Sequence, residues 1–169
     1  MGCDIHCYIE YKSATGRSWS SFGGRINPGR NYLMFGFMAG VRCDEMPHIP
    51  PRGAASDMAY KAADDNRLYI SKDCPESEGN CSPENAEQWV SRGISEYTDD
   101  RKEFVTNPDW HSYSWLTPSE FRNSLEQCLE YCASNSEPSD TCEYRAILAA
   151  LQSFENQGFE ARLVFWFDN

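Results

Sequence analysis

The sequence lacks any apolar segment long enough to cross a bilayer as a helix. It also lacks a signal-peptide pattern, because Met1 runs directly into an alternating stretch that contains Asp4 and His6. Basic residues are few, and 15 lysines and arginines against 26 acidic residues give a formal net charge of -11. A surface this acidic repels duplex nucleic acid and anionic membranes. These absences predict a cytoplasmic protein without a membrane or duplex nucleic-acid partner.

Cysteine is plentiful, but the arrangement that most often binds zinc is missing. The chain has eight cysteines and no CxxC pair. In the reducing compartment expected above, free thiols are favoured over disulfides. Buried cysteines acting as small apolar side chains are the simplest interpretation, and a structural zinc that uses some of them stays open.

Length and hydrophobic patterning predict one α+β domain over residues 1–169. Residues 3–12 alternate between apolar and polar, which is typical of a strand, and the turn that follows predicts a hairpin with residues 17–22. Residues 161–167 are apolar at every position except Arg162, which indicates a strand covered on both sides. Because helical patterns fill the middle, we expect an antiparallel or mixed sheet that includes the N-terminal hairpin and the C-terminal strand. The helices should pack on one face of that sheet.

Capping residues define three helices. Asn31 caps an expected helix over residues 32–39 that Gly40 ends, and Thr117 with Glu120 forms a capping box at the start of a second helix. Asp140 and Glu143 have the same three-residue spacing as this capping box and predict the start of a third helix. Residues 109–115, just before the second helix, are expected to form a loop.

Asp4 and His6 are the first candidates for chemistry. Two residues apart on a strand, they share one face about 6.5–7 Å apart, so a carboxylate and an imidazole can converge on one ion. The expected cofactor is a divalent metal: zinc, manganese or magnesium. The alternative is that this face, with Tyr8 and Glu10, is simply exposed to solvent. Further metal ligands would come from the other two histidines or from carboxylates, that is, from His48, His111, Asp109 or Asp168.

His111 lies among aromatic and hydroxyl side chains in the expected loop before the capped helix. Loops held by a rigid scaffold often carry function, so His111 is a candidate catalytic residue and metal ligand. We expect Asp4, His6 and His111 to converge in one pocket. The alternative is that Trp110 and Trp115 anchor the loop in the core with His111 between them.

Arginines beside turns are candidates for phosphate contacts in a chain this acidic. An adjacent tyrosine or tryptophan could stack on a base. The alternative for each arginine alone is an ion pair with a nearby acid. The candidate ligand-binding residues are Arg30, Asn31, Tyr32, Arg42, Arg52 and Trp115.

Several segments resemble a family of bacteriophage and bacterial proteins that begin with MGCDIH. The resemblance covers the opening residues 1–6, Arg30-Asn31-Tyr32, residues 38–42, residues 51–53, residues 111–117 and residues 164–168. It implies an origin as a phage or prophage accessory gene, and it implies no activity, cofactor or catalytic residue. Tyr113 departs from a His-Ser-His-Ser pattern, so a histidine at that position is not an indispensable ligand.

These residues support several functional hypotheses. The first is a metal-dependent hydrolase of a nucleotide or phosphodiester, in which Asp4, His6, His111 and Asp168 hold the metal or activate water. The second is a counter-defence protein that sequesters a small host nucleotide without cleaving it. A metal-free phosphodiesterase that uses His6 and His111, and an acidic inhibitor of a host protein, are further alternatives.

Overall fold

The computed structural model describes residues 2–65, 68–70, 96–98, 103–105, 110–138 and 140–168. The chain forms two compact units, one from residues 1–62 and 111–169 and the other from residues 63–110. The second unit contains an antiparallel sheet of β3 (Leu68–Ile70), β5 (Glu103–Val105) and β4 (Glu96–Thr98), in that order. The prediction of a single domain over the whole chain stays a prediction.

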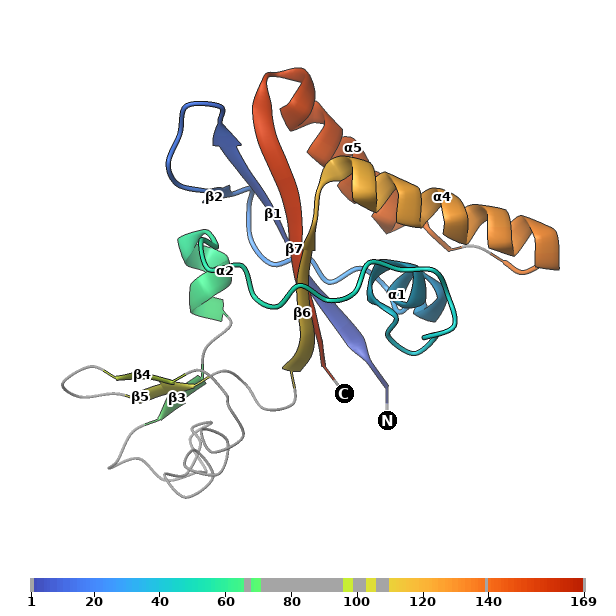
Figure 1. Ribbon diagram of the computed structural model, residues 1–169, viewed down its shortest axis with the longest axis horizontal. Coiled ribbons are helices and arrows are strands. Elements are labelled where there is room, and N and C mark those ends of the chain that lie inside the picture. The colour runs from blue at the N-terminus through green and yellow to red at the C-terminus, as the bar shows by residue number, and fades with distance from the viewer. Residues whose placement is uncertain are drawn as a thin grey trace. The chain divides into compact units, whose positions relative to one another are not determined.

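The first unit is built on a four-stranded sheet with the order β2-β1-β7-β6 (Figure 1). Its strands are β1 (Asp4–Ser13), β2 (Ser20–Ser21), β7 (Phe159–Asp168) and β6 (Trp110–Leu116). The first and last strands pair antiparallel along their whole length, from Asp4 opposite Asp168 to Ser13 opposite Phe159. The predicted α+β class, with the N-terminal hairpin and the C-terminal strand in one antiparallel sheet, is confirmed.

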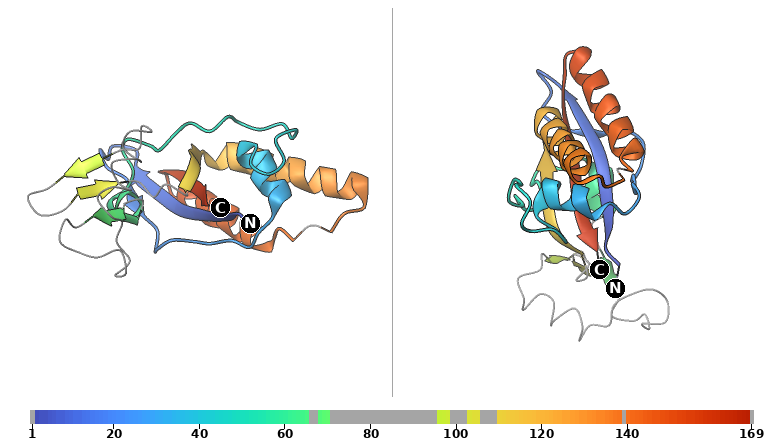
Figure 2. Two further views of the ribbon diagram at one scale, coloured as in Figure 1. Left: turned by 90° about the horizontal axis from the view of Figure 1, so that it is seen from below. Right: turned by 90° about the vertical axis from the view of Figure 1, so that its right-hand side faces the viewer.

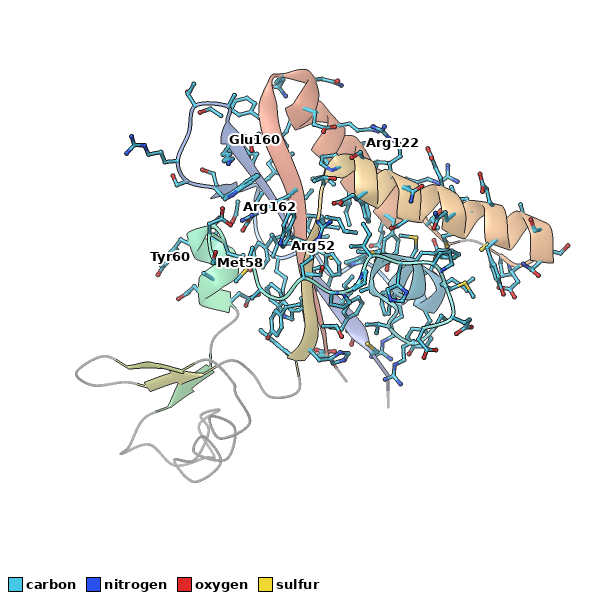
Figure 3. The ribbon with its side chains drawn as sticks, viewed as in Figure 1. Arg52, Met58, Tyr60, Arg122, Glu160 and Arg162 are labelled. Carbon is cyan, nitrogen blue, oxygen red and sulfur yellow. The ribbon has the colours of Figure 1, made fainter. Side chains whose placement is uncertain are left out.

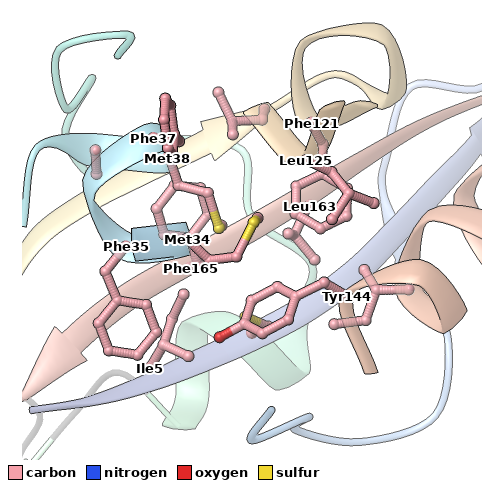
Figure 4. Packing of buried hydrophobic residues seen from close by; sticks show 14 of the residues in the cluster. Ile5, Met34, Phe35, Phe37, Met38, Phe121, Leu125, Tyr144, Leu163 and Phe165 are labelled. Atoms are coloured by element: carbon pink, nitrogen blue, oxygen red, sulfur yellow. The ribbon is translucent and has the colours of Figure 1, made fainter. Parts of the chain in front are cut away.

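Three helices cover one face of this sheet: α1 (Tyr32–Ala39), α4 (Pro118–Asn135) and α5 (Cys142–Asn156) (Figure 2). The sheet contributes alternate residues of β1 and β7 to the core between sheet and helices, and each is almost fully buried (Figure 4). Burying apolar surface on this scale is the main force that stabilises the unit. The sheet residues are Ile5, Cys7, Ile9, Leu163, Phe165 and Phe167, and Cys3, just before β1, joins them.

The caps confirm two of the three predicted helix starts. The Asn31 side chain accepts a hydrogen bond from the Met34 amide, and Gly40 ends α1 at a φ of 68°. Thr117 and Glu120 form the predicted capping box. The third start was wrong by one residue: Thr141 is the N-cap residue of α5 and its side chain makes no capping bond.

The opposite face of the sheet is covered as well at His6, Tyr8 and Glu10, so the alternative of a solvent-exposed face is wrong for these residues. His6, Tyr8 and Glu10 are 8%, 4% and 0% exposed. The residues that lead into α2 (Tyr60–Asp65) cover part of this face, because the Ala59 amide donates to the Glu10 carboxylate at 2.8 Å. The sheet therefore has an apolar helix side and a second buried side that carries polar groups.

The segment expected to be a loop before α4 is the edge strand β6. Ser112 within it has a φ of 52°, a left-handed conformation that interrupts the normal alternation of a strand. Gly53 of the preceding connection donates its amide to the Tyr113 carbonyl, which covers part of this edge. Aromatic and hydroxyl residues at 110–116 suggested a loop because their pattern lacks a regular period of two.

No helix among the described residues is long and apolar enough to cross a membrane. The six cysteines that the structure describes are free thiols, and four of them are buried. Cys74 and Cys81 lie outside the described residues.

Candidate functional site

The start of β1 and the end of β7 bring three predicted site residues together. Asp168 stands directly across from Asp4 in the strand pair, and its Oδ1 accepts the Asp4 backbone amide at 3.2 Å. Its Oδ2 lies 2.8 Å from Nε2 of His6. The other ring nitrogen of His6, Nδ1, is 3.3 Å from Oδ1 of Asn27. The His6 ring is thus fixed at both nitrogens, and one carboxylate ties the first strand to the last.

Arg30 completes this group from the loop before α1. Its Nη2 donates to Oδ2 of Asp4 at 2.8 Å, and its Nε donates to the other carboxylate oxygen. The Arg30 hydrogen bonds hold the pKa of Asp4 below its usual range. A Cβ atom on Gly2 would lie 2.1 Å from Nη1 of Arg30, so a larger residue at position 2 would displace the guanidinium from this place.

Tyr32 and Arg42 lie beside the same strand end. The Cys3 amide donates to the Tyr32 hydroxyl at 3.4 Å, and the Tyr32 ring is 40% exposed. The Arg42 guanidinium lies 5.9 Å from the centre of that ring. Arg42 adopts a φ of 66°, which costs a residue with a side chain on the order of 1 kcal/mol. Burial raises the pKa of the Cys3 thiol, and the nearby Arg42 opposes that shift.

We call this group the terminal cluster. It joins predicted candidates from both ends of the chain with residues that the sequence reasoning did not single out. Its members are Gly2, Asp4, His6, Asn27, Arg30, Tyr32, Arg42 and Asp168.

His111 lies on the other face of the sheet from His6. Its ring stacks with Phe167 at 6.1 Å, and Phe167 belongs to the helix-side core. The His6 ring instead lies 6.0 Å from Trp166, which points to the opposite side. The expected convergence of His111 with Asp4 and His6 in one pocket is therefore wrong. The left-handed Ser112 explains the difference, because it shifts the alternation so that Tyr113, and not His111, stacks on Trp166.

Arg52 and Trp115 form a separate group at the start of α4. The Arg52 guanidinium lies 4.3 Å from the centre of the Trp115 ring and donates to both carboxylate oxygens of Glu120. These hydrogen bonds lower the pKa of Glu120. Because Glu120 also closes the capping box, Arg52 stabilises the helix start, which is the ion-pair alternative considered for each arginine.

Two other candidates have structural partners. Asn31 uses its side-chain oxygen to cap α1 and its amide nitrogen to donate to the Asp140 carbonyl at 2.9 Å. His48 Nδ1 donates to the Met46 carbonyl oxygen at 2.7 Å, and a Cβ on Gly40 would lie 2.5 Å from its ring. Asp109 lies outside the described residues.

Within the described ranges, no three histidine, cysteine, aspartate or glutamate side chains are arranged to hold a metal ion. The prediction of zinc, manganese or magnesium stays a prediction. Asn27 was not among the predicted site residues, because nothing in the sequence except its place in the loop after the hairpin indicates its contact with His6.

Comparisons of this chain with protein families, with curated proteins and with solved structures found no match.

Proposed function

We propose that the protein binds a small nucleotide-like anion at the terminal cluster. The observation that carries the proposal is the exposed Tyr32 ring with the Arg42 guanidinium over it, close to a strand end that also carries Arg30. The two arginines of the cluster match its two carboxylates, Asp4 and Asp168, so this end of the sheet is locally balanced in a chain with a net charge of -11.

The chemistry of these groups suits a nucleotide. A guanidinium recognises a phosphate through paired hydrogen bonds, and a base can stack on an exposed aromatic ring. The left-handed backbone of Arg42 supports the proposal, since backbone strain concentrates at ligand-binding positions. Arg30 is half-exposed in its pair with Asp4, so an incoming phosphate can share or replace that partner.

A binding screen tests the proposal. Thermal unfolding is followed with adenosine triphosphate, guanosine triphosphate, cyclic dinucleotides, pyrophosphate and inorganic phosphate, because a ligand that binds only the folded state raises Tm. The affinity of any compound that raises Tm is then measured by calorimetry. Arg42→Ala should weaken binding at least about tenfold, which is the loss of one good charged contact.

Arg17→Ala is the matched control, because Arg17 is exposed in the turn of the hairpin, far along β1 from the terminal cluster. Equal affinity in Arg42→Ala and Arg17→Ala would contradict the proposed site. Tyr32→Ala should lose affinity for nucleotides and keep most of the affinity for pyrophosphate, which separates stacking from phosphate contacts.

A metal-dependent hydrolase of a nucleotide or phosphodiester is the second candidate function. It is favoured by the 2.8 Å contact between His6 and Asp168, because a carboxylate that orients an imidazole is a common feature of catalytic and metal-binding histidines. Incubation with each ligand that binds, followed by separation of products, distinguishes the two candidates. Unchanged ligand recovered after denaturation supports sequestration, and His6-dependent turnover supports hydrolysis.

The cellular setting remains part of the proposal. A phage accessory protein that acts against host defence in the cytoplasm would meet small nucleotide signals, and either binding or cleavage would silence them. Catalysis by His6 together with His111 lacks support, because the two rings lie on opposite faces of the sheet.

A further inference from the structure

The loop that carries Arg30 is held from two sides. On one side, the Arg30 guanidinium donates to both carboxylate oxygens of Asp4 on β1. On the other side, Gly29 contacts the first turn of α5, where the Glu143 carboxylate accepts the Gly29 amide at 2.5 Å. The Tyr144 hydroxyl donates to the Gly29 carbonyl at 2.9 Å. Both backbone polar groups of the residue before Arg30 are therefore bound by consecutive side chains of one helix.

The two side chains of α5 hold the loop in different ways. Tyr144 is 1% exposed and its ring belongs to the helix-side core, so its hydroxyl is fixed by packing (Figure 4). Glu143 is exposed and was expected to form a capping box with Asp140, but its carboxylate accepts the Gly29 amide instead. The Asp140 carbonyl adds a third contact, since it accepts the side-chain amide of Asn31 at 2.9 Å.

A fixed backbone beside Arg30 matters for binding, because the Arg30 side chain is 53% exposed and packing alone does not order it. Ordering a flexible side chain when a ligand binds costs free energy, and a side chain already held in the binding geometry avoids much of that cost. We propose that Glu143 and Tyr144 are positioning residues for the ligand site: they hold Gly29 so that Arg30 presents its guanidinium at the end of β1. This role rests on the proposed function and identifies what gives that site its geometry.

A positioning role differs from a purely structural one in what it changes. A contact that serves only the fold changes the free energy of unfolding and leaves the affinity of the folded molecules as it was. A positioning contact changes the affinity, and the size of that change depends on whether Arg30 is present.

The experiment is a calorimetric titration with pyrophosphate, made well below the Tm of each variant. Tyr144→Phe removes only the hydroxyl and retains the ring in the core, and it should weaken pyrophosphate binding about three- to tenfold. In an Arg30→Gln background the same substitution should have no further effect, because the guanidinium through which it acts is gone. The same fold-loss in both backgrounds would overturn the positioning role.

Glu143 allows a second test that leaves the core untouched, because its side chain is exposed. Glu143→Ala should weaken pyrophosphate binding by a similar factor, and Glu143→Gln, which retains an oxygen that can accept the Gly29 amide, should recover most of the affinity. Glu155→Ala is the matched control, since it removes an exposed glutamate near the other end of α5. Equal affinity in Glu143→Ala and Glu155→Ala would contradict the role of Glu143.

The Nε–H group of Arg30 provides a readout in the protein without ligand. This group donates to Asp4, so its proton should exchange slowly with water in the wild type and faster in Tyr144→Phe. An unchanged exchange rate, measured by nuclear magnetic resonance, would overturn the positioning role. A wild type that binds no compound of the screen would overturn the proposed function and with it the role in binding, whereas equal pyrophosphate affinity in the wild type and Tyr144→Phe would overturn the positioning role alone.

Discussion

The two ion pairs on the first strand lie at opposite ends of the same strand pair and in opposite surroundings. Asp4 and Arg30 have side chains that are 48% and 53% exposed, whereas Glu10 and Arg162 are 0% and 6% exposed. We call Glu10 and Arg162 the buried cluster; Trp19 and Asp57 contact it from outside, and the Asp57 side chain is 61% exposed. Asp4 and Glu10 are six positions apart on β1, so both side chains point to the same face of the sheet. Their different exposure therefore comes from what covers each end of that face.

In the buried cluster nearly every polar atom has a partner within the chain. Arg162, labelled in Figure 3, lies on β7 beside the residues that lead into α2. It stands opposite Glu10 in the strand pair, donates to it at 2.9 Å, and also donates to the Asp57 side chain and carbonyl. The Trp19 ring covers the guanidinium at 4.0 Å. Such an arrangement stabilises one conformation, because a buried charge without its partner is costly.

The terminal cluster has the opposite character. Its ion pair is open to water, where a pair contributes little to stability and a ligand can compete for either partner. Strand β1 thus carries one carboxylate that holds the fold together where it is enclosed, and another that is available for binding where the sheet ends.

Arg162→Ala should lower the free energy of unfolding by about 3–5 kcal/mol, because it leaves Glu10 buried without its cationic partner. Urea unfolding followed by circular dichroism measures the loss. Replacing both residues by methionine should recover most of it, since two apolar side chains leave no unpaired charge. A loss below 1 kcal/mol in the single variant would remove the contrast between the clusters.

Arg52→Ala tests an intermediate case. Arg52 and Glu120 are 27% and 28% exposed, and Arg52 also packs on Trp115. We expect a loss of about 1–2 kcal/mol from the charged hydrogen bonds and the aromatic contact. Arg52→Lys retains the charge without the paired geometry and should lose part of this amount. A loss as large as that of Arg162→Ala would show that burial does not set the scale.

The pH dependence of stability should differ in sign between two glutamates. Hydrogen bonds from Arg52 lower the pKa of Glu120, so its contribution is present above the ordinary glutamate pKa of about 4.3 and is lost as pH falls through the lowered value. Burial raises the pKa of Glu10, so proton uptake there relieves an unfavourable charge as pH falls toward that ordinary value.

Unfolding curves between about pH 7 and 3 measure both effects. Glu120→Gln should flatten the loss of stability below about pH 4.3, and Glu10→Gln should steepen the loss above it. The same slope in both variants would contradict the assignment of opposite shifts.

Arg30→Gln should have the smallest effect on stability, within about 1 kcal/mol of the wild type, because its pair with Asp4 is exposed. The same substitution should weaken the binding of a phosphate-bearing ligand several-fold. Parallel unfolding and calorimetry on one preparation measure both quantities, and a large loss of stability with unchanged affinity would reverse the roles of the two clusters.

Much of the fold could be predicted from local patterns. The alternation at residues 3–12, the caps at Asn31 and Thr117 and the apolar run at 161–167 each depend on neighbouring residues alone, and each predicted element is present. Strand β6 could not be predicted in this way, because the left-handed Ser112 removes the period of two on which the pattern depends.

The candidate site was only partly predictable for a related reason. Asp4, His6 and Asp168 lie at the ends of two strands, so pairing the first strand with the last was enough to bring them together. Asn27 reaches His6 from a loop, and Glu10 reaches Arg162 across 152 positions in the chain. Such contacts depend on strand register and loop path, which no local pattern in one sequence encodes.

Hydrogen exchange with and without adenosine triphosphate tests the division between the two clusters most directly. The account predicts added protection at the amides of residues 2–4 and 30–42, which surround the terminal cluster, and unchanged protection at Ala59 and along the middle of β7, where the buried cluster is closed in both states. Ligand-dependent protection confined to residues 57–59 would contradict this division. So would the absence of added protection in both regions with saturating adenosine triphosphate and with saturating pyrophosphate.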